Sequence, residues 1–167
     1  MNTLALLAVL AVSQTPTPPA EMNQLKPFHG TWTGDVQIKP PGSPGFGGLA
    51  TWKIAPVIDG LYVQMELAHE IKGMGVVRGT TMLNWDKEAG KFRSFTFSNN
   101  PAELGKPRNE LVSLKGSVLE YPLADGGGGI QFGQSFEVLP SGRLKFVMRM
   151  VQDGKETVIA HAELTKS

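Results

Sequence analysis

Apolar and polar residues alternate along most of the chain from Thr31 onward, with the period of two that is typical of half-buried β-strands. The first run places Trp32, Gly34, Val36 and Ile38 on one face. A later run, residues 61–71, carries one histidine within an otherwise apolar face. That face consists of Leu61, Val63, Met65, Leu67, His69 and Ile71. We therefore expect His69 to point inward with its apolar neighbours.

The same period continues to the C-terminus. Residues expected to face inward on the last two strands are Leu144, Phe146, Met148 and Met150, then Val158, Ala160, Ala162 and Leu164. Turn signals rich in Gly, Pro, Asp and Asn separate the strands, and Asp59-Gly60 is the best hairpin signal. Pro40–Gly48 is expected to be a loop, because proline is excluded from central strands. The segments favour an all-β fold, an up-and-down antiparallel β-barrel of about ten strands.

The N-terminal segment has a different pattern. Leu4 to Val12 is a run of nine apolar residues, too short to span a bilayer but suited to a signal peptide. We predict a signal peptide over residues 1–13, a Thr/Pro-rich linker over 14–20 and a barrel domain over 21–167, which begins with a short helical turn before Phe28. The mature protein would be periplasmic or secreted, with no stable membrane span. A short buried apolar segment is the alternative, since Met1–Thr3 carries no Lys or Arg.

Charge and cysteine content exclude several classes of function. Sixteen basic and fifteen acidic residues give a net charge of +1, without basic blocks, so no nucleic-acid partner is expected. The absence of cysteine excludes disulfides, thiolate metal sites and a cysteine nucleophile. We find no spacing typical of a catalytic or metal site. The sequence leaves the oligomeric state open.

The opening motif Leu25-x-x-Phe28-x-Gly30-x-Trp32-x-Gly34 resembles the start of calycin-like barrels, which include lipocalins, fatty-acid-binding proteins and haem-binding nitrobindins. The chain is also similar to an uncharacterised family of small bacterial proteins, often exported. This likeness rests on the opening motif together with Asp59-Gly60, Asn84-Trp85-Asp86 and Asp153-Gly154-Lys155. The resemblance covers about Leu25 to Lys166 and implies a calycin-like barrel. The chain departs from fatty-acid-binding proteins by a Pro/Gly loop in place of a helical lid, and from nitrobindins by lacking their further glycines.

Six residues are candidates for contact with a small apolar or amphipathic ligand inside the barrel, namely His69, Trp32, Met65, Trp52, Phe146 and Met148. His69 could fix the polar end of such a ligand, or be a core histidine bonded to Thr80 or Thr81. Trp32 could line the cavity or plug one end of the barrel, and the plug is favoured. The methionines and phenylalanines suit an adaptable cavity and a filled barrel equally.

Three functions follow. The first is a binding module for a small apolar ligand, with no cofactor. The second is a structural or partner-binding envelope module with a filled barrel. The third, implied by the resemblance to nitrobindins, is a haem-binding enzyme. His161 occupies a place late in the chain loosely similar to their haem-binding histidine, although alternation points it outward beside Glu163.

Overall fold

The computed structural model describes residues 16–73, 75–99 and 106–167, so the predicted signal peptide and the start of the linker lie outside the described residues. Two 3-10 helices, η1 (Ala20–Phe28) and η2 (Ile58–Gly60), accompany the strands. The strands are β1 (Gly30–Ile38), β2 (Phe46–Val57), β3 (Tyr62–Ile71), β4 (Gly75–Asp86), β5 (Lys91–Ser98), β6 (Arg108–Lys115), β7 (Val118–Glu120), β8 (Ala124–Gly127), β9 (Ile130–Val138), β10 (Leu144–Gln152) and β11 (Lys155–Lys166).

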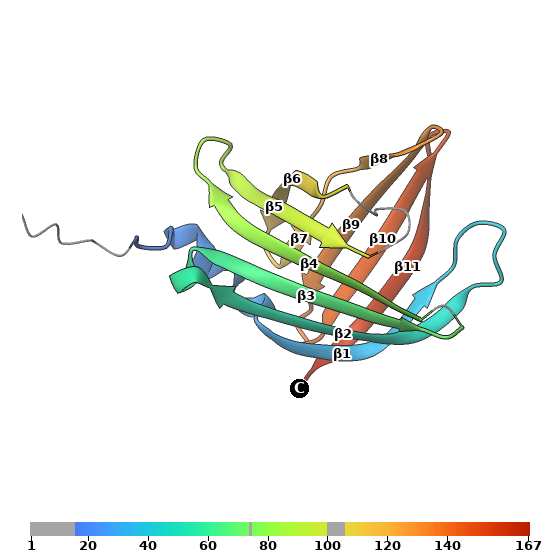
Figure 1. Cartoon of the computed structure of the whole chain (residues 1–167), viewed down its shortest axis with the longest axis horizontal. Coiled ribbons are helices and arrows are strands. Elements are labelled where there is room, and N and C mark those ends of the chain that lie inside the picture. The colour runs from blue at the N-terminus through green and yellow to red at the C-terminus, as the bar shows by residue number, and fades with distance from the viewer. Residues whose placement is uncertain (1–15, 74, 100–105) are drawn as a thin grey trace, which may run out of the picture.

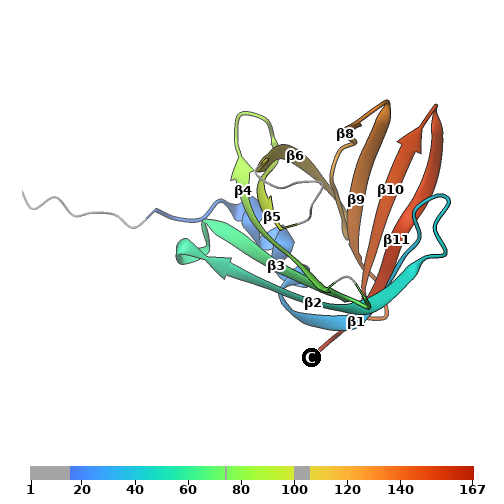
Figure 2. The same cartoon turned by 45° about the vertical axis from the view of Figure 1, so that its right-hand side comes forward.

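Ten of these strands close into an antiparallel barrel, as predicted (Figure 1, Figure 2). Neighbouring strands run β10-β11-β1-β2-β3-β4-β5-β6-β7-β9, and pairing of β9 with β10 completes the ring. The short β8 pairs with β9 beyond the end of β7. The sheet is therefore a series of hairpins closed by its own ends, which leaves few free strand edges.

Gly34 in the opening motif allows β1 and β11 to approach closely. A Cβ atom built on Gly34 would lie 2.7 Å from the carbonyl oxygen of Glu163 and 3.1 Å from the side chain of Leu164. These contacts are too short for any residue with a side chain. The second glycine of Gly-x-Trp-x-Gly thus has a packing role at the seam where the chain closes the barrel.

Helix η1 lies where the helical turn was predicted, and it covers the barrel end at which β1 begins. Its apolar residues Met22, Leu25 and Phe28 are buried in the core. The indole Nε1 of Trp32 donates a hydrogen bond to the carbonyl oxygen of Phe28 at 2.7 Å, which joins η1 to β1. Among the described residues no helix is long and apolar enough to cross a membrane.

The predicted inner face is confirmed for the residues within β3, whereas Leu61 lies before the strand at the end of η2. The last strand departs from simple alternation. Ala160, Ala162 and Leu164 are buried as expected, whereas Val158 is 50% exposed and the prediction for it was wrong. The register between β10 and β11 shifts here, because Met148 pairs with Ala160 while the next residue pairs with Val158. The extra residue, Ile159, reverses the side of the sheet on which the positions before it lie, Val158 included.

The loop prediction for Pro40–Gly48 was also too long. Strand β2 begins at Phe46, Gly47 pairs with β1, and Gly48 pairs with both β1 and β3. A Cβ on Gly48 would lie in contact with the carbonyl oxygen of Glu70. Glycine here marks a close approach of backbones within the sheet, which composition alone cannot distinguish from a flexible loop.

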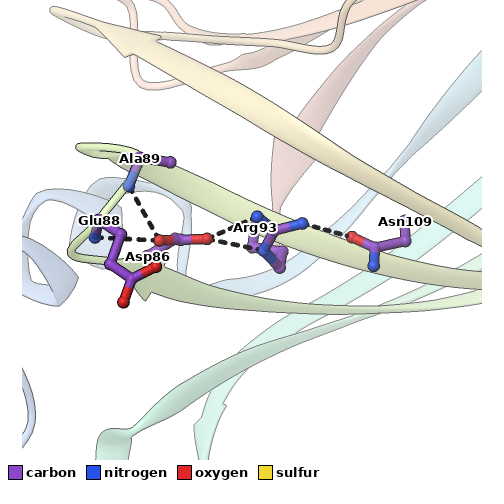
Figure 3. A network of polar contacts seen from close by, with 5 residues as sticks. All are labelled: Asp86, Glu88, Ala89, Arg93 and Asn109. Carbon is purple, nitrogen blue, oxygen red and sulfur yellow. Dashed lines mark hydrogen bonds and ion pairs between the residues drawn. The ribbon is translucent and has the colours of Figure 1, made fainter.

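The turn after Asn84-Trp85-Asp86 is held by a polar network on the outer surface (Figure 3). Asp86 Oδ1 accepts hydrogen bonds from the backbone N–H groups of Glu88 and Ala89, and Oδ2 accepts one from Arg93 Nε at 2.8 Å. Arg93 Nη1 donates in turn to Asn109 Oδ1 at 3.0 Å, so the network connects β4, β5 and β6. The bond from Ala89, followed by that from Arg93, lowers the pKa of Asp86. The network around Asp86 therefore stabilises the turn between β4 and β5 on the outer surface, while Trp85 of the same motif packs against the core.

Candidate functional site

The barrel contains a cavity of about 270 Å³ at the end opposite η1. It lies between the end of β1, the β3–β4 hairpin, and parts of β5, β9, β10 and β11. Its apolar lining includes Val36, Ile38, Leu67, Ile71, Val77 and Met148. This volume lies near the lower end of the range of small-molecule pockets, which begins at about 300 Å³.

His69 contributes a polar group to this cavity, and Trp52 holds it in place. The indole Nε1 of Trp52 donates a hydrogen bond to His69 Nε2 at 2.9 Å. An indole nitrogen can only donate, so Nε2 must be the unprotonated nitrogen of the ring. The proton of the neutral imidazole therefore lies on Nδ1. No described contact of His69 involves Nδ1, and the ring lines the cavity.

Aromatic rings pack around this pair. The ring of Trp52 is fully buried, with Phe136 and Phe146 against it at centroid distances of 5.3 and 5.1 Å. Phe146 also lies 6.2 Å from the ring of His69. These edge contacts fix the orientation of Trp52, and Trp52 in turn fixes the tautomer of His69. The alternative of a core histidine bonded to a neighbouring strand is confirmed, but the partner is Trp52 on β2 and not Thr80 or Thr81 on β4.

Burial lowers the pKa of His69 below its ordinary value of 6.5. The Trp52 bond acts in the same direction, because a protonated Nε2 would place N–H against N–H. Arg108 on β6 is the other ionisable residue that lines the described part of the cavity, and its Nη1 lies 3.9 Å from Glu110 Oε1. His69 is thus neutral at pH 7.

Neutral His69 makes stability depend on pH. The unfolded chain binds a proton at a higher pH than the folded chain does, so the free energy of unfolding decreases as pH falls below 6.5 and levels off below the folded pKa. We expect His69→Gln, which keeps a hydrogen-bond acceptor for Trp52, to lose part of this dependence. Urea unfolding between pH 7.5 and about pH 4.5 measures it. Equal slopes in the two proteins would contradict the assignment; any slope left in the variant reflects other groups, such as His29, whose pKa is also lowered.

The wall opposite the apolar residues is polar, which sequence reasoning missed. Thr81 Oγ1 and Thr96 Oγ1 lie 2.9 Å apart, and Ser94 Oγ lies 3.2 Å from Thr96 Oγ1. Arg108 pairs with Thr96 across the β5–β6 ladder and Glu110 pairs with Ser94, so these side chains share the inner face. The alternation of Phe92, Ser94, Thr96 and Ser98 contained this signal, but polar residues on a β-strand usually indicate the solvent face.

The structure brings four of the six candidate ligand residues together. His69, Trp52, Phe146 and Met148 line the cavity. Trp32 does not, since it is 1% exposed and packs beside η1 at the closed end. Met65 is also outside the lining, and its sulfur lies 4.0 Å from the hydroxyl of the buried Tyr121.

The described residues do not fit haem. His161 is exposed on β11, where it pairs with Gln37 and Val147, and it does not line the cavity. The Nε2 lone pair of His69 accepts the Trp52 bond, and its Nδ1 carries a proton.

Fold and cavity together define a small, closed, ten-stranded antiparallel β-barrel whose interior is packed at one end and hollow at the other. Among solved structures the chain is similar to Rv2717c from M. tuberculosis, with a TM-score of 0.64 and 16% sequence identity. The match covers 90% of this chain and 99% of that one. At this identity the likeness shows a shared fold only. Neither the protein-family models nor the curated protein sequences contain a match to the chain.

Proposed function

We propose that this barrel is a binding protein that holds a small, largely apolar molecule in the cavity beside His69. The observation that carries the proposal is the cavity of about 270 Å³, which combines an apolar lining with a few polar groups. Apolar pockets with a small number of well-placed polar side chains are the usual form of small-molecule sites. A calycin-like relationship and export of the protein, the latter supported by the apolar run Leu4–Val12, belong to the same proposal.

Small residues at the cavity wall favour binding over the filled-barrel alternative. Gly79 on β4 and Ala160 on β11 both line the cavity. Cross-strand partners of Gly79 are Leu67 and Ser98, which share the inner face with it. Larger apolar residues at these positions would fill the space, as they do around Trp32 at the other end.

A titration with Nile red, an uncharged dye that brightens in apolar surroundings, tests the proposal. We expect saturable binding of one dye per chain, with energy transfer from tryptophan because Trp52 lines the cavity. Native mass spectrometry of the purified protein should in addition detect a one-to-one complex with the dye. The proposal would be overturned if dye fluorescence rises without saturation and native mass spectrometry detects only the free chain.

A further inference from the structure

On the apolar side of the cavity, His69 presents a directed hydrogen-bond donor, whereas the other polar side chains of the lining are Thr81, Thr96, Ser98, Arg108 and Gln134. Trp52 occupies Nε2 of His69 at 2.9 Å, which leaves Nδ1–H as the group that the ring can offer to a ligand. Because Trp52 is buried against Phe146 and Phe136, this donor is held in one orientation. A fixed donor discriminates between ligands according to whether they carry an acceptor.

The cavity carries little net charge despite the presence of Arg108. Arg108 and Glu110 lie two residues apart on the inner face of β6, with 3.9 Å between Arg108 Nη1 and Glu110 Oε1. The side chain of Glu110 is only 11% exposed, so it is confined to the interior with its partner. An anion placed beside Arg108 would also meet the negative charge of Glu110. The neutral ring of His69 supplies no compensating positive charge.

We propose that the ligand is an uncharged, mainly apolar molecule with one hydrogen-bond acceptor, such as an ester or ketone oxygen, and that His69 Nδ1–H donates to this acceptor. The inference rests on the proposed binding function and adds the chemical class of the ligand. The apolar body of the molecule lies against Val36, Leu67 and Met148, where it needs no polar partner. A carboxylate would lose its hydration without a free cation to replace it.

Displacement of Nile red by three ligands of similar length tests this class. Methyl decanoate carries a neutral acceptor, undecane carries no acceptor, and decanoate at pH 8 carries a charged one. A single net hydrogen bond is worth about 1 kcal/mol, so the ester should bind about three- to tenfold more tightly than undecane. Decanoate should bind at least tenfold more weakly than the ester.

Variants at His69 test whether its Nδ1–H causes the preference for the ester over undecane. His69→Phe keeps a ring without an N–H, so the ester should lose its advantage over undecane in this variant. In His69→Gln the amide oxygen can accept from Trp52 and the amide N–H can donate, so part of the preference should return. The ligand series on the unmodified protein remains decisive if His69→Phe fails to fold.

Different results separate the inference from the function on which it rests. Tighter binding of decanoate than of the ester, lost in Arg108→Met, would overturn the inference and show that Arg108 binds an anion. Equal affinity of ester and undecane would overturn it as well. Both results leave the binding function in place. If the dye binds saturably but none of the three ligands displaces it, the proposed chemical class of the ligand is wrong. If the dye itself does not bind, both proposals fail.

Discussion

Replacing Trp32 with alanine is expected to lower the free energy of unfolding by about 3–5 kcal/mol, because it removes the largest buried side chain at the closed end of the barrel. The loss combines three contributions. A cavity remains between η1 and the sheet, the hydrogen bond to the Phe28 carbonyl disappears, and the Lys166 ammonium, 5.2 Å from the ring centroid, loses its cation–π contact. Urea unfolding at pH 7 measures the change.

A second tryptophan provides the comparison. Trp85 is only partly buried and packs edge-on against Phe92, so Trp85→Ala should be clearly less destabilising than Trp32→Ala.

The Trp32→Ala variant should also keep its dye binding. At temperatures where it is still folded, it should bind Nile red as the unmodified protein does, since Trp32 lies outside the cavity lining. Unchanged stability would show that Trp32 is not a core residue. Loss of dye binding by the folded variant would show that the closed end takes part in the site.

Introducing a leucine at Gly79 is expected to weaken Nile red binding at least tenfold while the protein becomes more stable. A Cβ at Gly79 would lie 3.4 Å from the Phe97 carbonyl oxygen and 3.8 Å from the Ser98 Cβ, both ordinary contacts, and would project toward the cavity. A leucine side chain there displaces a large part of the 270 Å³. Burial of apolar surface, and removal of glycine from a strand, should raise the free energy of unfolding by about 1–2 kcal/mol.

Gly47→Leu is the matched control for this substitution. Gly47 also lies within a strand, its backbone is not strained, and a Cβ there would meet only the exposed side chain of Gln37 at 3.5 Å. Since this position is on the outer face, dye binding should stay within twofold of the unmodified value. Unaltered binding in Gly79→Leu would contradict the placement of the ligand, and a similar loss in both variants would indicate a general effect on the sheet.

Prediction of the fold succeeded because the physical signal is local. Each side chain on a strand faces opposite to its neighbours, so the alternation through Trp32, Val36 and Met65 reveals the inner face without knowledge of the partners. The bulge beside Val158 escaped prediction for the same reason. It lies in the register between β10 and β11, where Met148 pairs with Ala160 but Arg149 pairs with Val158, and alternation within a single strand does not contain that register.

The candidate site was only partly within reach of sequence reasoning. His69 stood out because its strand neighbours are apolar, and the structure places it at the cavity with Trp52, Phe146 and Met148. The polar wall of Thr81, Thr96 and Arg108 did not stand out, because a polar residue on a strand gives the same pattern whether it faces solvent or a cavity. Met65 and Trp32 were grouped with the ligand residues because alternation identifies the inner face but not the height along the barrel.

The amino-acid sequence by itself determined that this chain is a series of antiparallel strands with one apolar face, since hydrophobic burial acts on every second residue. Tertiary structure alone decided which part of that interior is solid and which is hollow. That outcome depends on how side chains from six or more strands pack at one level of the barrel, and on which strands lie side by side. The hydrogen bond from Trp52 to His69 depends in addition on the register of β2 against β3, which pairs Ala50 with His69 and Trp52 with Leu67.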